Sequence, residues 1–332
     1  MAPRLTSRSA TAYTRPMATY LVTGGAGFIG SHIVRRLLDL GEGVRVIDNL
    51  STGKRANLVD VIDRIELIEG DITRSEDVAR AVQGVDFVLH QAALPSVPRS
   101  VKDPITTDFN NVRGTLELLV AARDAKVRRV VQACSSSAYG DTPTLPKVET
   151  MRPNPISPYA CSKAAGELYG CAFCRTYGLE YVGLRYFNVF GARQDPASQY
   201  AAVIPRFITA YIKGEAPVVY GDGTQSRDFC YIDNVVQANL KACVAPDAPG
   251  KIFNIACGER ITLLQVLDQL TEIFGKHIAP TFELHRAGDV KHSLADIELA
   301  KRVLGYEPAV LFAEGLRRTV DWYRRQGAHA PS

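Results

Sequence analysis

A glycine-rich turn near the N-terminus constrains the fold of this chain more than any other feature. The apolar run Tyr20–Val22 precedes three glycines spaced three residues apart, and apolar residues then recur with helical periodicity. Gly24, Gly27 and Gly30 allow a tight strand-to-helix turn, close approach of backbone N–H groups to a pyrophosphate, and close packing of helix on strand. The next apolar run ends in Asp48, whose carboxylate can accept hydrogen bonds from an adenosine ribose. The sequence therefore predicts a strand–helix–strand unit that binds a dinucleotide.

The same carboxylate bears on the identity of the dinucleotide. A negative charge beside the ribose repels a 2′-phosphate, so Asp48 favours NAD over NADP. Lys54 and Arg55 follow closely in the sequence and leave NADP open as an alternative.

Length and composition are typical of a soluble enzyme with two lobes. The chain has 332 residues, of which 46% are hydrophobic and 22% are charged. No apolar run approaches the roughly 18 residues that span a bilayer, so no membrane association is expected. The net charge is +4, and three arginines in residues 1–16 account for much of it, so a nucleic-acid partner is not expected.

Residues 1–16 lack the apolar segment of a secretory signal. We expect these residues to be a disordered tail or the result of a start codon assigned too far upstream, with a transit-like peptide as the alternative.

Seven cysteines are an odd number without the spacing of a disulfide scaffold, which favours reduced thiols and a cytoplasmic location. Cys171 and Cys174 have the spacing of a redox pair, but they fall inside a predicted helix rather than at its N-terminus, so we expect core thiols. The histidines and cysteines show no metal-ligand spacing, and no metal is expected.

Predicted strands and helices alternate beyond the first unit, which indicates a parallel sheet with helices on both faces. We expect strands at 65–69, 87–89 and 129–133, the last closing the series, and helices at 75–82 and about 104–124. Two stretches follow strand ends, where open α/β sheets bind ligands. Asp71 can reach an adenine amino group, and the small residues of Gln91–Ala93 let the backbone pass close to a cofactor.

A serine, a tyrosine and a lysine form the candidate catalytic constellation. Ser135 lies near the end of the fifth predicted strand, and Tyr159 and Lys163 are four residues apart at the start of a predicted helix. A phenol with a pKa near 10 is a poor base at neutral pH, but a neighbouring ammonium group and the positive nicotinamide favour its phenolate. The serine hydroxyl can hydrogen-bond the same substrate oxygen and relay its proton.

With these motifs, the chain resembles the extended short-chain dehydrogenase/reductase superfamily, and within it the nucleotide-sugar 4-epimerases. The resemblance covers about residues 17–326 and runs through TGGAGFIGSH, DNLSTG, HQAALPSVPRS, SSSAYGD, SPYACSK, GLRYFNVFGARQDP, GDGTQSRDFCYIDN and RAGDVKHSLAD. It implies an α/β fold: a Rossmann-type doubly wound parallel sheet with a smaller C-terminal α/β substrate-binding domain. The expected NAD-binding domain spans 17–188, with 229–257 returning to it, and 189–328 mainly binds the UDP-sugar.

The resemblance also implies a role for each site residue. The catalytic residues are Ser135, Tyr159 and Lys163. The expected contacts to NAD are Gly24, Gly27, Phe28, Ile29, Gly30, Asp48, Asn49, Ser51, Gly53, Asp71, Ile72, Gln91, Ala92, Ala93, Tyr159, Lys163 and Tyr186. The expected contacts to the nucleotide sugar are Ser136, Ser137, Asn188, Ala202, Val203, Tyr220, Arg227, Arg286, Asp289 and Ser293.

Three positions bear on the reaction and on the sugar. The related 4,6-dehydratases carry an Asp-Glu pair where this chain has Ser136 and Ser137, which cannot supply the acid and base for water elimination. Epimerisation needs only hydride removal and return at C4, so NAD should be held tightly. Ser293 matches a position that is a bulky tyrosine in epimerases confined to UDP-glucose and UDP-galactose. Its small side chain favours UDP-GlcNAc and UDP-GalNAc, with the plain hexoses also accepted.

Three alternatives remain open: a UDP-glucose or UDP-glucuronate 4-epimerase, a UDP-glucuronate decarboxylase, and a non-catalytic NAD-sensing protein. The intact serine, tyrosine and lysine argue against the sensor. The resemblance further implies a homodimer through a four-helix bundle, built from the helices around 111–123 and 159–177, whose apolar residues extend beyond the core-facing side.

Overall fold

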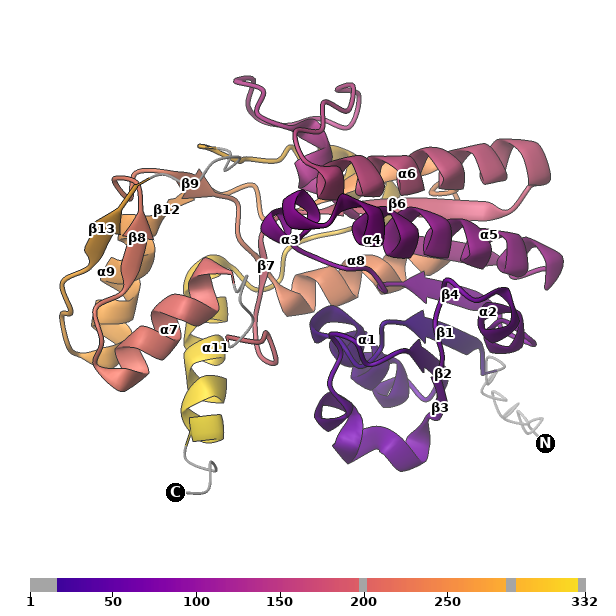
Figure 1. Cartoon of the computed structure of the whole chain (residues 1–332), viewed down its shortest axis with the longest axis horizontal. Helices are drawn as coiled ribbons and strands as arrows, with labels where there is room; N and C mark the ends of the chain where they lie inside the picture. The colour runs from indigo at the N-terminus through magenta and orange to yellow at the C-terminus, as the bar shows by residue number, and fades with distance from the viewer. Residues whose placement is uncertain (1–16, 197–201, 285–290, 328–332) are drawn as a thin grey trace, which may run out of the picture.

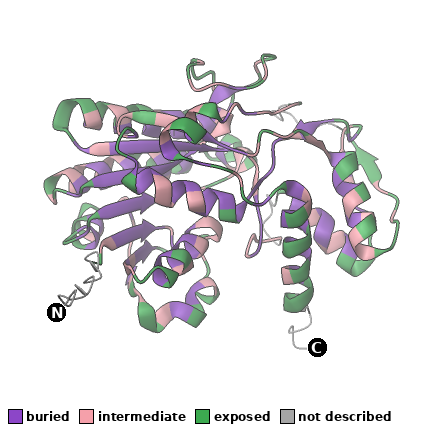
Figure 2. Cartoon of the chain, turned by 180° about the vertical axis from the view of Figure 1, so that it is seen from behind, coloured by how far each residue is buried: buried purple, intermediate pink, exposed green. Residues whose placement is uncertain are grey.

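A seven-stranded parallel sheet forms the centre of the computed structural model, which describes residues 17–196, 202–284 and 291–327 (Figure 1). The central strands are almost continuously buried because helices cover both faces of the sheet, whereas the edge strand β3 is largely exposed (Figure 2). From one edge to the other they are β11 (Lys251–Ile255), β6 (Glu180–Tyr186), β5 (Arg129–Ser135), β4 (Phe87–His90), β1 (Thr19–Thr23), β2 (Gly43–Asp48) and β3 (Glu66–Glu69).

The strand order reverses between β1 and β4. The chain moves outward from β1 through β2 to β3, and then returns to the other side of β1 to form β4. Loops on the two sides of such a reversal turn away from each other and leave a crevice at the carboxyl ends of the strands. This crevice is where the predicted dinucleotide turn lies, because Gly24 directly follows β1.

Two helical layers enclose the sheet. Helices α1 (Phe28–Asp39) and α8 (Ile232–Val244) contact each other on one face. On the other face, α2 (Ser75–Ala81) packs on α5 (Gly114–Asp124), and α5 packs on α6 (Pro158–Tyr177). The doubly wound α/β fold is therefore as the sequence predicted.

The structure differs from the sequence prediction in two places. The expected closure of the strand series at the fifth strand was wrong, because β6 and β11 extend the sheet beyond β5. The strand β11 forms only after the chain has left the sheet and returned, so its partner is distant in sequence. The helix expected at about 104–124 is present without a break, but it contains a π-helical turn, so that it runs through α4 (Pro104–Asp108), η2 (Phe109–Arg113) and α5.

A smaller lobe follows the Rossmann-like part (Figure 1). It contains α7 (Val203–Lys213), α9 (Leu263–Phe274) and α11 (Phe312–Gly327). Short strand pairs accompany these helices: β8 (Val218–Tyr220) with β13 (Thr281–Glu283), and β9 (Ser226–Arg227) with β12 (Ile261–Thr262). The exact boundaries of the two predicted domains stay a prediction.

The remaining elements are short connectors. They are η1 (Arg55–Arg64), α3 (Val97–Lys102), η3 (Ser136–Tyr139), β7 (Val189–Phe190), β10 (Cys230–Tyr231) and α10 (Glu298–Leu304). Within the described part of the chain, no helix has both the length and the hydrophobicity needed to cross a bilayer.

Two glycines on one face of α6 let this helix lie unusually close to the sheet. A Cβ atom built on Gly170 would lie 2.1 Å from the ring of Tyr181 in β6, and one on Gly166 would lie 2.5 Å from the side-chain amide of Gln132 in β5. Tyr181 is fully buried and its hydroxyl donates to Gln132 at 2.9 Å, so its ring cannot move aside. The position of α6 over β5 and β6 therefore depends on the missing side chains.

We predict that Gly170→Ala destabilises the protein by about 1–3 kcal/mol, although alanine favours helices, because the methyl group overpacks a rigid contact. Urea unfolding measures the change. The same substitution in a Tyr181→Val background should lose most of this cost, since the ring is gone. An equal cost in both backgrounds would contradict the packing explanation.

Candidate active site

A cavity of about 930 Å³ opens at the carboxyl ends of β1, β2, β4 and β5 and collects most of the predicted cofactor residues. Those that line it are Gly24, Gly27, Phe28, Ile29, Gly30, Asp48, Asn49, Ser51, Gly53, Ile72, Gln91, Ala92, Ala93, Tyr159, Lys163 and Tyr186. Asp71 is not among the lining residues. Its carboxylate instead accepts hydrogen bonds from the backbone and hydroxyl of Thr73 and from the side-chain amide of Asn49.

The glycine-rich turn has a shape that side chains would destroy. Gly24 adopts φ +67°, which favours glycine. A Cβ on Gly30 would lie 2.2 Å from the carbonyl oxygen of Gly24. Gly27 is the N-cap of α1 and provides no side-chain cap, so the first turn of the helix presents backbone N–H groups toward the cavity. This cradle fits a dinucleotide pyrophosphate.

Asp48 ends β2 and is held rigidly at the cavity wall. It is 7% exposed, and its two oxygens accept hydrogen bonds from the backbone N–H groups of Ala26 at 2.9 Å and Leu50 at 2.8 Å. Burial raises the pKa of this carboxyl group, while the two backbone donors oppose the rise. Each oxygen keeps a second lone pair that can accept a ribose hydroxyl.

Lys54 and Arg55, which kept NADP as an alternative cofactor in the sequence analysis, both form ion pairs with carboxylates. Lys54 pairs with Asp195 at 2.8 Å, and Arg55 pairs with Glu69. A 2′-phosphate at Asp48 would therefore have to compete with existing ion pairs, in addition to the repulsion from Asp48 itself.

The tyrosine and lysine lie at the start of α6. Ser157 caps this helix by accepting from the backbone N–H of Ala160 at 3.2 Å, and Pro158 occupies its first turn. Lys163 is 7% exposed and its Nζ donates to the carbonyl of Ala133 at 2.9 Å. Burial lowers the pKa of Lys163 and raises the pKa of Tyr159.

Ser135, Ser136 and Ser137 are not among the residues that line the cavity, but Ser135 at the end of β5 is close enough to Tyr159 to influence its phenol. The hydroxyl oxygen of Ser135 accepts from the backbone N–H of Ser137 at 3.2 Å and from the Ser137 hydroxyl at 2.8 Å. With its oxygen used as an acceptor, the Ser135 hydroxyl proton is free to be donated elsewhere. The Ser135 hydroxyl also lowers the pKa of the Tyr159 phenol, which burial raises more strongly. Ser136 and Ser137 form the η3 turn that follows.

The structure reveals a buried polar group that the sequence analysis missed. Asn111, in the π-helical turn η2, is 3% exposed. Its side chain accepts from the backbone N–H of Leu94 at 2.7 Å and donates to the hydroxyl of Ser162 at 3.0 Å. Ser162 in turn donates to the carbonyl of Tyr159 at 2.8 Å, so this chain of hydrogen bonds reaches the catalytic tyrosine of the prediction. In the sequence, the only indication of this buried group was a single asparagine within a helical pattern.

His90 at the end of β4 is a second buried group that was not assigned. Its ring nitrogens contact the hydroxyls of Thr23 at 2.8 Å and Thr115 at 3.0 Å. Burial, with a smaller contribution from the charge of Lys163, lowers the pKa of His90 to about 3, so the ring is neutral at physiological pH.

Two of the residues predicted to contact the sugar, Ser293 and Asn188, are hydrogen-bonded to each other. Asn188 adopts φ +31° and donates to the hydroxyl of Ser293 at 3.1 Å. The same hydroxyl accepts from the backbone N–H of Asp228 at 3.3 Å. Ser293 therefore holds Asn188 in place as well as being small.

The other predicted substrate residues are spread over the smaller lobe. Ala202 lines the cavity and is the N-cap of α7, whose first residue is Val203. The guanidinium of Arg206 lies 5.3 Å from the ring centroid of Tyr220. Arg227 donates to the carbonyls of Ser226 and Lys291, each at 3.0 Å. Arg286 and Asp289 lie outside the described residues.

The cysteines are free thiols. Cys171 and Cys174 lie within α6, as the sequence indicated, and burial raises the pKa of Cys171.

Comparison with known sequences gives a family match over most of the chain. The model of the NAD dependent epimerase/dehydratase family matches residues 20–256. A putative UDP-glucose 4-epimerase of Methanocaldococcus jannaschii is 38% identical over 307 residues, which cover 92% of this chain and 98% of that protein. A UDP-glucose 4-epimerase of Mycolicibacterium smegmatis is also 38% identical, over 310 residues with the same coverage.

Solved structures are similar over nearly their whole length. The UDP-N-acetylglucosamine 4-epimerase of Methanobrevibacter ruminantium M1, in complex with UDP-N-acetylmuramic acid, has a TM-score of 0.89 at 41% identity and covers 93% of this chain and 99% of its own. The UDP-glucose 4-epimerase of Thermotoga maritima, with UDP-glucose, has a TM-score of 0.89 at 39% identity and the same coverage. The Thermus thermophilus UDP-glucose 4-epimerase in complex with NAD has a TM-score of 0.84 at 39% identity, covering 92% of this chain and 99% of its own. With a doubly wound sheet, a pyrophosphate cradle and these relatives, the chain belongs to the NAD-dependent epimerase/dehydratase family.

Proposed function

We propose that this NAD-dependent nucleotide-sugar 4-epimerase interconverts UDP-GlcNAc and UDP-GalNAc, and that it also accepts UDP-glucose and UDP-galactose. Ser293 is the observation that carries the choice of sugar, since a serine leaves room for an acetamido group where a tyrosine would fill the space. Overall similarity does not separate the two classes, because structures named for either sugar are about equally identical to this chain.

We further propose that the reaction depends on Tyr159, Lys163 and Ser135. NAD would be held by the glycine-rich turn and Asp48, and it would supply the hydride acceptor and donor for C4 of the sugar, by way of a transient 4-keto sugar. Tyr159 removes the proton of the 4-hydroxyl as the hydride leaves and restores it when the hydride returns. Since burial raises the pKa of the phenol, a cation must stabilise its phenolate, and Lys163 lies one helical turn away.

Ser135 complements the tyrosine. Its hydroxyl oxygen accepts two hydrogen bonds from Ser137, so its own proton remains available for donation. This proton can be donated to the 4-oxygen of the sugar, where negative charge develops during proton transfer. The neutral Ser136 and Ser137 supply no acid or base for dehydration, although dTDP-glucose 4,6-dehydratases are among the similar proteins.

The other candidate functions make different products. A decarboxylase would convert UDP-glucuronate to a pentose with release of carbon dioxide, and a UDP-N-acetyl-alpha-D-glucosaminuronate decarboxylase is 32% identical to this chain. An NAD sensor would produce no sugar product at all. Incubating the purified protein with UDP-GlcNAc, UDP-glucose and UDP-glucuronate, and resolving the products by NMR, tests all of these candidates. Conversion of UDP-glucuronate alone would overturn the proposal.

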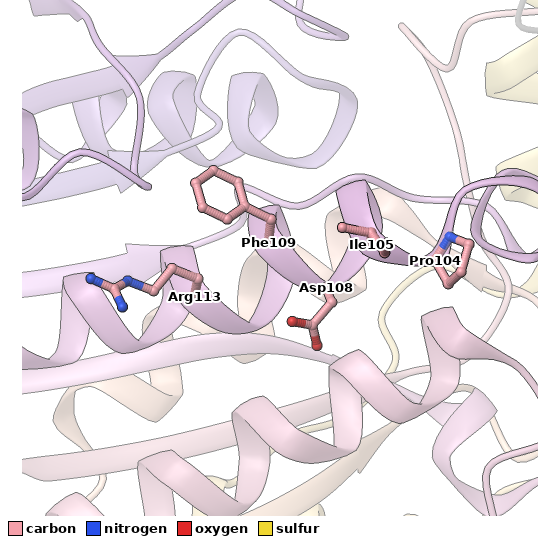
Figure 3. A pocket seen from close by; sticks show the side chains of 5 residues that line it. All are labelled: Pro104, Ile105, Asp108, Phe109 and Arg113. Carbon is pink, nitrogen blue, oxygen red and sulfur yellow. The ribbon is translucent and has the colours of Figure 1, made fainter.

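We also propose that two copies pair through α4, η2, α5 and α6. The face formed by these helices exposes large apolar side chains: Ile105 is 80% exposed, Phe109 54% and Leu168 67%. Figure 3 shows Ile105 and Phe109 on the α4–η2 segment, at a surface groove lined also by Pro104, Asp108 and Arg113. Adjacent exposed apolar residues of this kind mark interfaces more often than free surface. The four-helix bundle implied by the family resemblance would bury them.

We predict that Tyr159→Phe lowers turnover by about 10²–10⁴-fold, because the ring stays but the ionisable hydroxyl is lost. The affinity for UDP-sugar, measured by calorimetry, should change little. Tyr177→Phe at the other end of α6, where the side chain is 52% exposed, is the matched control and should retain full turnover. Near-normal turnover of Tyr159→Phe would rule out the proposed base.

We predict that Ser293→Tyr lowers kcat/KM for UDP-GlcNAc by roughly 5- to 150-fold while sparing UDP-glucose, because the ring occupies the space of the acetamido group. Ser293→Ala separates size from hydrogen bonding. It releases Asn188 without adding bulk, so both substrates should lose kcat/KM equally. Parallel losses in Ser293→Tyr would remove the argument for UDP-GlcNAc.

We predict that Phe109→Asp converts a dimer to a monomer, since a buried unpaired carboxylate at the centre of an apolar interface costs several kcal/mol. Sedimentation velocity measures the mass. Val59→Asp in η1, at a site 69% exposed on a different surface, is the control and should leave the mass unchanged. A monomeric wild-type protein would contradict this assembly.

A further inference from the structure

A row of buried charges runs along α6 from the proposed catalytic pair into the core. Glu167 is one helical turn beyond Lys163, so both side chains lie on the same face of the helix. The Glu167 carboxylate forms a bidentate ion pair with Arg185 of β6: Nε donates to Oε1 at 3.0 Å and Nη2 to Oε2 at 2.7 Å. Both side chains of this pair are 4% exposed.

The same arginine connects α6 to the serine turn. The guanidinium of Arg185 lies 4.5 Å from the ring centroid of Tyr139, the last residue of η3. In the sheet, Arg185 is paired with Cys134, the residue before Ser135. Arg185 therefore contacts the turn that carries Ser135 and the helix that carries Tyr159 and Lys163.

Stability alone does not account for this arrangement. A buried ion pair repays little more than its desolvation cost, and apolar residues of similar volume stabilise a core equally well. Arg185 even leaves Nη1 buried without a hydrogen-bond partner among the described residues. Burial lowers the pKa of Lys163, and the charge of Glu167 is among the influences that raise it again. Glu167, one helical turn away, thus has an electrostatic effect on Lys163.

We propose that Glu167, held by Arg185 and Tyr139, is a positioning residue that keeps the buried Lys163 in its ammonium form and fixes α6 against the Ser135 turn. The inference rests on the proposed roles of Tyr159 and Lys163. The inference adds that Glu167 supplies the negative charge that offsets the positive charges at the site. Lys163 and Arg185 carry two positive charges and Glu167 one negative charge, so ionisation of Tyr159 brings the cluster to neutrality.

Three titratable groups beside the cluster, His90, Cys134 and Tyr139, do not change charge near neutral pH. Burial lowers the pKa of His90 to about 3, raises the pKa of Tyr139 to about 12, and raises the pKa of the Cys134 thiol strongly. The groups that face Lys163 and Glu167 from the packed elements are His90 of β4, Cys134 of β5, Tyr181 and Arg185 of β6, and Tyr159 and Cys171 of α6, with Tyr139 and Glu149 facing Arg185.

The test is the pH profile of kcat for Glu167→Gln and Glu167→Asp, with whichever of UDP-glucose and UDP-GlcNAc the wild type converts faster. Because Glu167 raises the pKa of Lys163, loss of its charge lets Lys163 lose its proton at lower pH. The alkaline limb of the Glu167→Gln profile should move down by about one pH unit, which is about a tenfold loss of kcat on that limb. Glu167→Asp keeps the charge and should retain the wild-type alkaline limb, with lower kcat from the shorter side chain.

A double variant separates the electrostatic role from folding. Glu167→Gln leaves the buried Arg185 unpaired and can reduce folding, whereas Glu167→Leu with Arg185→Met removes both charges and should recover the thermal unfolding temperature. The alkaline limb of its pH profile should still lie at lower pH than that of the wild type, because the carboxylate of Glu167 is no longer next to Lys163. The ion pair between Arg129 and Glu180, at 2.7 Å, provides the matched control. These are the first residues of β5 and β6, so the pair lies at the end of the two strands away from Cys134 and Arg185. Glu180→Gln should change stability but not the pH profile.

The outcomes distinguish this inference from the proposed function. If Tyr159→Phe retains turnover, the catalytic assignment is wrong, and the inference about Glu167 is wrong as well because it rests on that assignment. If Tyr159→Phe is inactive but Glu167→Gln keeps the wild-type alkaline limb, only the role of Glu167 is overturned. Full recovery of both stability and the pH profile in the double variant would likewise overturn it, because the pair would then be structural.

Discussion

The close packing of α6 on β5 and β6 is the constraint on which the candidate site depends. Gly166 and Gly170 bring the helix against the sheet, and Lys163 reaches the carbonyl of Ala133 only because the two elements are so near. The same approach buries Glu167 against Arg185. A helix displaced outward by a side chain would separate the tyrosine and lysine from the serine turn, so packing and the proposed chemistry depend on the same contacts.

The strand reversal between β1 and β4 provides the space for the cofactor. The loops after these strands diverge, and the glycine-rich turn places the N-terminus of α1 at the resulting cavity. NAD is the cofactor of the family to which the chain belongs, and Asp48 together with the ion pairs of Lys54 and Arg55 is consistent with it. One topological feature therefore determines both the cavity and the orientation in which a dinucleotide can lie within it.

Long-range hydrogen bonds join segments of the smaller lobe to the residues that follow β6 and β11. The hydrogen bond from Asn188 to Ser293 joins residues distant in sequence, and the buried carboxylate of Asp228 accepts from the backbone of Cys257, Gly258 and Ala295. Together they connect the segments around Ser293 and Asp228 to the residues that follow β6 and β11. Substitution of Ser293 is therefore expected to affect the position of Asn188.

The sequence by itself determined the glycine-rich turn and the placement of Tyr159 and Lys163 on one helical face, because each depends on local spacing. The alternation of strands and helices indicated the parallel sheet, and the family resemblance implied its doubly wound order. The sequence analysis missed β6 and β11 as sheet strands, the π-helical turn that buries Asn111, and the partnership of Glu167 with Arg185. These features depend on contacts between segments far apart in the chain. Periodicity along a single element contains no record of such partners, and only the tertiary structure decided which buried charges and amides meet.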